Sequence, residues 1–157
     1  MVFKNQKQLE SFLMKQSRQA LMKAQDKVYG IIKKFVYQFY NEYKDPKEYL
    51  RTYQFLESLV QSRVVSDGKG YKVEIYFDAS GMNYPTEHVP RKSGWEGSAR
   101  WDGETVLKVA MEGEFPHGGY AGAGGTPIWG VATAELDAKA INILIDMLRA
   151  EGIPVKK

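Results

Sequence analysis

Three groups of residues in this chain have side chains that could do chemistry, and each group lacks a part that the chemistry needs. The first is a glycine-rich segment, residues 119–125 (Gly-Tyr-Ala-Gly-Ala-Gly-Gly). Phosphate-binding loops use glycines so that backbone N–H groups can approach the anion, and a Lys-Ser/Thr pair and a helix start follow. Here Thr126 and Pro127 follow instead. The segment is therefore interpreted as a loop that becomes ordered against a partner, with nucleotide binding as the alternative.

The second group is formed by the two histidines. His117 stands between Pro116 and two glycines, and His88 follows Glu87. A histidine in such a place can act as a general base or as a metal ligand. No His-x-x-x-His pair is present to hold a metal on one face of a helix. We therefore expect structural hydrogen bonding from these histidines, and no metal and no cofactor.

The third group combines carboxylates with tryptophans. Glycoside hydrolases place two carboxylates on either side of the bond that they cleave. Candidates here are Glu96, Asp102 and Glu104, with Trp95 and Trp101 available for stacking on a sugar. Tryptophan is also enriched among the residues that anchor protein interfaces, and that is the preferred interpretation. A small carbohydrate-active or peptidoglycan-directed hydrolase remains the alternative function.

The element that dominates the chain is a predicted amphipathic helix, residues 6–43. Apolar residues recur at steps of three, four or seven positions, which is the period of a helix: Leu9, Leu13, Ala20, Ala24, Val28, Ile31, Phe35 and Phe39. At ~1.5 Å per residue such a helix is roughly 50 Å long, more than the small body behind it can cover. A neighbouring subunit is therefore expected to pack on it.

The remainder predicts an α+β fold with a small antiparallel sheet. Asp45-Pro46 ends the long helix and begins a short one, residues 46–60. The Asp67-Gly68 pair predicts a hairpin turn, and alternating apolar residues predict a strand at residues 71–78. Together with two long loops, 79–103 and 113–127, a sheet of three or more strands is expected between residues 62 and 130.

Two further elements complete the prediction. Residues 105–112 predict another strand, and Ile128-Trp129 a short strand or a docking anchor. The closing helix is expected at residues 134–150, with Leu136, Ala140, Ile143, Leu144, Met147 and Leu148 on its apolar face. Gly152 and Pro154 stop it. Residues 1–157 are predicted to form a single domain.

The composition limits the classes of function. The chain has 157 residues and no Cys, which excludes disulfides, thiolate zinc sites and cysteine nucleophiles. The first residues lack the pattern of a signal peptide, and the longest apolar runs are too short to span a bilayer. These features predict a soluble protein made in the cytoplasm.

The net charge of +3 is mild, but basic residues concentrate on the predicted long helix. Before Glu42 only Glu10 and Asp26 oppose eight of them: Lys4, Lys7, Lys15, Arg18, Lys23, Lys27, Lys33 and Lys34. The simple interpretation is a solvated polar face. The sharper one is a face turned toward DNA, because phosphate contacts need no base readout. The residues expected to face such a DNA channel are Lys15, Arg18, Lys23 and Lys27.

Residues 45–59 (Asp-Pro-Lys-Glu-Tyr-Leu-Arg-Thr-Tyr-Gln-Phe-Leu-Glu-Ser-Leu) resemble the minor head–tail joining family of tailed bacteriophages of Gram-positive hosts, the tail-completion or neck proteins. In that family a long first helix precedes an Arg-Thr…Leu…Ser-(Leu/Ile) segment that leads into a strand. A second strand, a His-Gly segment, an aromatic docking residue and a closing helix follow. The matching parts here are residues 71–78, His117-Gly118-Gly119, Ile128-Trp129 and residues 135–150. The insertion at residues 80–103 is longer than the family's pattern.

The resemblance implies a virion structural protein without enzymatic activity. It implies a homo-oligomeric ring at the head–tail junction that links the connector to the tail, although a tail terminator or a minor capsid protein would look similar. The implied partners are other copies, other neck and tail proteins and nearby genomic DNA, with no membrane and no small-molecule substrate. The host bacterial cytoplasm is the implied place of synthesis. The residues expected to anchor the interfaces are aromatic: Tyr37, Tyr40, Tyr43, Trp95, Trp101, Tyr120 and Trp129.

Overall fold

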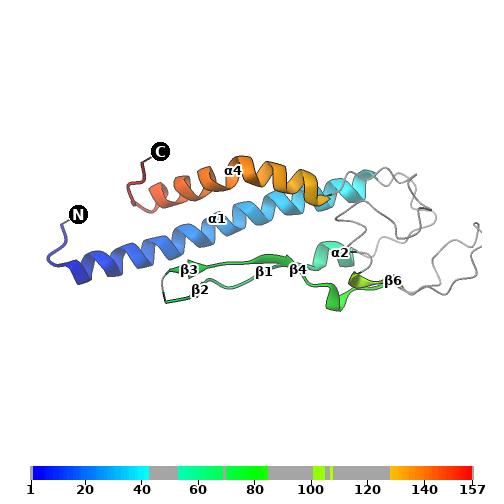
Figure 1. Ribbon diagram of the computed structural model, residues 1–157, viewed down its shortest axis with the longest axis horizontal. Coiled ribbons are helices and arrows are strands. Elements are labelled where there is room, and N and C mark those ends of the chain that lie inside the picture. Colours follow the sequence, from blue (N-terminus) through cyan, green and yellow to red (C-terminus); the bar gives the residue numbers. More distant parts are fainter. Residues whose placement is uncertain are drawn as a thin grey trace, which may run out of the picture. The chain divides into compact units, whose positions relative to one another are not determined.

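The computed structural model describes residues 2–42, 53–68, 70–84, 101–104, 107 and 128–156. Its fold is α+β, as predicted: a long N-terminal helix, a small antiparallel sheet and a C-terminal helix (Figure 1). The elements, in chain order, are α1 (Gln6–Glu42), α2 (Gln54–Glu57), β1 (Leu59–Gln61), β2 (Val65–Ser66), β3 (Tyr71–Lys72), β4 (Ile75–Phe77), the 3₁₀ turn η1 (Ala79–Gly81), β5 (Asn83–Tyr84), β6 (Trp101–Asp102) and α4 (Ile128–Ala150).

Helix α1 confirms the predicted long helix to within one residue at its end. Asn5 caps it: the Asn5 side-chain oxygen accepts a hydrogen bond from the Gln8 backbone N–H at 3.0 Å. Such a cap satisfies one of the N–H groups that the first helical turn leaves without a partner. Gly30 lies inside the helix without breaking it. The sequence pattern alone was therefore enough to place this element.

The chain divides into two compact units. The first comprises Met1–Ile31, Gln61–Ile75 and Glu135–Lys157, and the second comprises Ile32–Val60 and Tyr76–Ala134. The first unit thus holds most of α1, the turn end of the hairpin and most of α4. The second holds the end of α1, α2, the open end of the hairpin and the strands β5 and β6.

In the first unit a β-bulge interrupts the hairpin. Ser62 N–H donates to the Glu74 carbonyl at 2.8 Å, whereas further along Val65 lies opposite Lys72. The three steps from Ser62 to Val65 therefore match the two steps from Glu74 to Lys72, which leaves one extra residue on the first strand. The Glu74 N–H donates to the Ser62 hydroxyl at 2.8 Å. The Ser62 carbonyl accepts instead from the Gln25 side-chain amide of α1 at 2.9 Å, and the same amide lies 3.3 Å from the Glu74 carbonyl.

The C-terminal end of α4 also belongs to the first unit. Gly152 adopts a positive φ of 81°, and the N–H groups of Gly152 and Ile153 donate to the carbonyls of Arg149 and Leu148, both at 2.9 Å. This is the Schellman arrangement that ends a helix at glycine, and it confirms the predicted stop. Glu151, just beyond α4, forms an ion pair with Lys23 of α1. The guanidinium of Arg149 donates hydrogen bonds to the Val155 carbonyl.

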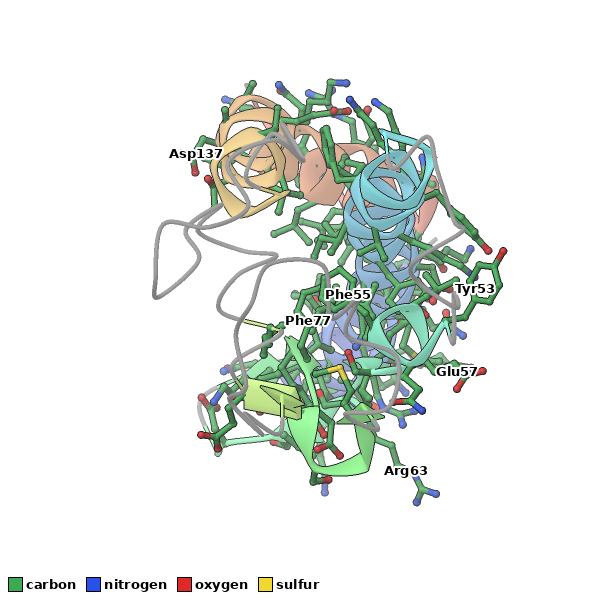
Figure 2. All side chains as sticks on the ribbon, turned by 90° about the vertical axis from the view of Figure 1, so that its right-hand side faces the viewer. Tyr53, Phe55, Glu57, Arg63, Phe77 and Asp137 are labelled. Carbon is green, nitrogen blue, oxygen red and sulfur yellow. The ribbon has the colours of Figure 1, made fainter. Side chains whose placement is uncertain are left out.

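The second unit contains an aromatic core. Phe55 of α2 is fully buried and stacks on Phe77 of β4, with ring centroids 5.1 Å apart and planes tilted by only 8°. Figure 2 shows the two rings side by side, while Tyr53, directly before α2, and Glu57 of α2 point outward. Other buried apolar residues of this unit are Ile32, Phe35, Val36, Leu59, Met82 and Ala132.

The ends of the long 79–103 connection are structured in the second unit. Asp78 caps η1, and β5 pairs antiparallel with β6 so that Tyr84 lies opposite Trp101. Gly103, directly after β6, is buried. A β-carbon on Gly103 would stand 2.3 Å from the Ala79 carbonyl oxygen and 2.8 Å from the Met82 β-carbon. Only glycine therefore allows this approach of the chain to η1.

Two predicted elements are wrong in part. The short helix predicted at residues 46–60 contains only α2 within the described residues, and Leu59 and Val60 belong to β1. The reason is pairing: the Ser58 carbonyl accepts from the Asp78 N–H at 2.7 Å, so the chain leaves the helix to join β4. The strand predicted at residues 105–112 is wrong at Leu107, which is helical. Its apolar run could not distinguish a helix from a strand.

The expected limits of the sheet and of the closing helix also need correction. The sheet begins at Leu59 instead of residue 62, because β1 follows α2 directly. Helix α4 begins at Ile128 instead of residue 134, so Ile128-Trp129 forms its first turn and not a strand. The strand predicted at residues 71–78 is confirmed as β3 and β4, with residues 71, 73, 75 and 77 turned inward.

Candidate assembly interface

The first unit leaves the beginning of α1 uncovered. Leu9 is 38% exposed, Leu13 36% and Met14 53%. Between residues 6 and 19 only Phe12, Gln16 and Ser17 are partly covered. We call residues 6–19 the open α1 segment.

This exposure divides the predicted apolar stripe, which the sequence indicated was too long to be covered fully. Ala20 and Ala24 are buried as predicted, but Leu9 and Leu13, on the same stripe, are exposed. The pattern continues one apolar face along the whole helix. The elements that cover this face do not reach its first turns, so Leu9 and Leu13 lie at the surface.

Helix α4 carries more apolar surface than one neighbour can cover. The predicted face, which includes Leu136, Ala140, Ile143 and Met147, is partly covered, and no side chain between residues 135 and 150 is fully buried. A second line of apolar residues follows α4 at steps of three and four: Ala138, Ile141, Ile145 and Leu148. Ile141 is 72% exposed, and Leu144, between the two lines, is exposed as well. We call Ala138, Ile141, Leu144, Ile145 and Leu148 the α4 seam.

The charges near these two surfaces differ in their balance: Glu10 is the one acid of the open α1 segment, against three basic residues. Lys7, Lys15 and Arg18 on the open α1 segment are exposed and make no ion pair within the described residues. On α4, Asp137 and Asp146 are likewise exposed and without an ion pair there. Figure 2 shows Asp137 pointing away from α4. The remaining α4 charges are engaged: Lys139 pairs with Glu135 at 2.7 Å, and Arg149 holds the Val155 carbonyl.

The four residues predicted to face DNA do not share one line of α1. Lys15, Arg18, Lys23 and Lys27 are all exposed. Nine residues advance a helix by about two and a half turns, so Arg18 and Lys27 lie on opposite sides of α1. Lys23 is engaged with Glu151. Contact with DNA stays a prediction.

The predicted aromatic anchors are described unevenly. Tyr37 is exposed on α1, with the Lys33 ammonium 5.9 Å from the centre of its ring. For Tyr40 in α1, Trp101 in β6 and Trp129 in α4 the structure describes the backbone only. Tyr43, Trp95 and Tyr120 lie outside the described residues. Of the α4 seam, sequence reasoning placed Leu144 and Leu148 on the apolar face and missed Ala138, Ile141 and Ile145, although their spacing of three and four residues was visible.

The residues considered for catalysis are not brought together in the described part of the chain. Glu96, His88 and His117 lie outside it, Asp102 belongs to β6, and Glu104 is exposed in the helical turn after β6. Within the described residues no group of three His, Cys, Asp or Glu side chains could hold a metal.

The resolved pKa shifts belong to structural contacts of the hairpin. Hydrogen bonds from the Ser80 hydroxyl at 2.6 Å and the Ser80 N–H at 3.0 Å lower the pKa of Asp78. The hydrogen bond to Glu74, and then its charge, raise the pKa of Lys72. The Asp78 contact stabilises the fold above the ordinary aspartate range and is lost as the pH falls below it. A helix cap and a surface ion pair account for both shifts.

Comparison with known families decides the relationship of this chain. The model of the YomN family matches residues 5–151. The chain belongs to the YomN family. This family is phage-derived, and the match includes both the open α1 segment and the α4 seam. The two surfaces are therefore part of the family's own region of the chain.

The other comparisons add no relative of known role. A comparison with curated proteins and one with solved structures each found no match. Among the described residues, no helix combines the length and the hydropathy that crossing a membrane requires.

Proposed function

We propose that this YomN-family protein is a non-enzymatic structural protein of a phage virion, which assembles as a homo-oligomeric ring at the head–tail junction. The observation that carries the proposal is the imbalance of the first unit. Among its described residues only Ala20 and Ala24 are buried apolar side chains, whereas Leu9, Leu13, Met14 and Ile141 stand exposed. Surfaces of this kind mark interaction sites.

The phage origin of the family and the resemblance of residues 45–59 to neck proteins support the place in the virion. At a head–tail junction a ring must pass DNA, and Lys15, exposed on the other side of α1 from Leu13, suits that environment. Its partners in this proposal are other copies of the chain and other neck and tail proteins. In this scheme the tryptophans near residues 95–101 anchor contacts between proteins and do not stack on sugars.

The test is to remove the coding sequence from the phage and to examine the particles by electron microscopy. The proposal predicts filled heads and separate tails, and joined particles once the wild-type chain is supplied again. Supplying an Ile141→Asp chain should not restore joining, whereas the matched Asn142→Asp chain, changed at the exposed neighbouring position, should restore it. Joined, complete particles in the absence of the protein would refute the proposal. A defect confined to host-wall degradation would favour a hydrolase.

A further inference from the structure

We propose that the α4 seam of one copy packs on the open α1 segment of a second copy, head to tail. This inference rests on the proposed function, for which it supplies the contact between neighbouring subunits. Both surfaces belong to the first unit of the same chain, and each carries exposed apolar side chains in the single copy, although Ile145 and Leu148 of the seam are partly covered. The α4 seam of one copy can therefore pack on the open α1 segment of a second copy, and the second copy's own seam stays available for a third.

The dimensions of the two surfaces match. The α4 seam runs from Ala138 to Leu148, and the open α1 segment from residue 6 to residue 19. At ~1.5 Å per residue these stretches are about 15 and 20 Å long. Residues at steps of three and four form the kind of ridge that packs into a facing helix. Ile141, the most exposed side chain of the seam, would be the central knob.

Charge selects the head-to-tail arrangement over a symmetric one. Two α4 seams facing each other would bring the Asp137 side chains of both copies together, because Asp137 lies about one helical turn before Ile141. Two open α1 segments would bring together Lys7 and Arg18 from each, because these lie seven residues before and four residues after Met14, on its side of the helix. Facing one α4 seam with one α1 segment instead places carboxylates beside cations, and like charges in an interface cost affinity. An interface between two different faces repeats from copy to copy and closes into a ring if the rotation allows it.

The absence of cysteine in the chain allows a direct test by disulfide trapping. Leu13→Cys and Ile141→Cys proteins are prepared separately, mixed under mild oxidation, and resolved on a non-reducing gel. Each protein alone and the mixture of Ser11→Cys with Asn142→Cys serve as controls. These control positions are exposed, and Ser11 lies on the other side of α1 from Leu13, because two residues turn a helix by about 200°.

The expected result is a mixed Leu13→Cys/Ile141→Cys dimer as the dominant product, well above either homodimer and the control mixture. Its yield should fall at high salt, because exposed charges are then screened. A dominant Ile141→Cys homodimer would overturn the inference in favour of a symmetric contact. No trapping above the controls, while light scattering shows the wild-type chain to be oligomeric, would overturn the inference and leave the proposed function standing. No trapping from a chain that stays monomeric would overturn both.

Discussion

The two units of this chain differ in what they bury. The second unit has fully buried Phe55 and Val36, a stacked Phe55–Phe77 pair and a closely packed Gly103. In the first unit, the buried side chains among the described residues are two alanines and Gln25. Apolar burial is the largest favourable term in folding, so within the described residues the second unit holds most of the stabilising core. We infer that the first unit is completed by assembly.

The substitution with the largest expected effect disrupts the core of the second unit. Replacing Phe55 by alanine removes a fully buried ring and its stacking contact with Phe77. The substitution should lower the free energy of unfolding by about 3–5 kcal/mol in urea denaturation. The control is Tyr76→Ala, which removes an outward-facing ring from the adjacent hairpin. Equal losses from the two substitutions would contradict the existence of this core.

The next effect concerns the close approach at Gly103. An alanine there would force its β-carbon against the Ala79 carbonyl, and we expect a loss of about 1–3 kcal/mol in the same assay. Gly81→Ala is the matched control, because nothing lies within 4 Å of the position of its added carbon. A Gly103→Ala protein as stable as the control would show that the chain after β6 does not pack on η1.

In the first unit a polar contact takes the place of an apolar core. Gln25→Glu keeps the size of the side chain but turns a donor that serves two carbonyls into an acceptor. We expect a loss of about 1–3 kcal/mol, with faster hydrogen exchange in residues 61–75. Gln19→Glu, on the exposed side of the same helix, should change neither quantity. Unchanged exchange in Gln25→Glu would mean that α1 does not hold the bulge.

The smallest expected effect is an increase in stability. Gly30 sits inside α1 with open space around it, so Gly30→Ala should stabilise the protein by about 0.5–1 kcal/mol. Gly152→Ala should have the opposite sign, since Gly152 needs its positive φ to end α4. Thermal unfolding of the two variants checks both signs. A loss from Gly30→Ala would indicate that the helix requires a glycine there.

Patterns among neighbouring residues correctly predicted the elements whose physical cause is local. The hairpin turn at Asp67-Gly68 appears where expected, with φ of +84° at Gly68, and the alternation of residues 71–77 matches their burial. The end of α4 at Gly152 follows from the same kind of reasoning. In each case the neighbours along the chain supply the whole physical cause.

Tertiary contacts decided what the sequence left open. Leu9 and Ala20 lie on one predicted stripe, yet one is exposed and the other buried, because burial depends on how far the covering elements reach. The short helix lost its end to the pairing of Ser58 with Asp78. The α4 seam was visible in the spacing of Ala138, Ile141, Ile145 and Leu148. The spacing did not show whether these residues face a core or solvent.

The most direct test of the central claim is the molar mass of the purified wild-type chain, measured by light scattering across a range of concentrations. One chain has a mass of 17.8 kDa. If assembly completes the first unit, the mass should rise with concentration to a plateau at a fixed multiple of this value, and Ile141→Asp should prevent the rise without unfolding the chain. A mass of one chain at every concentration, alone and with neck proteins added, would contradict the account.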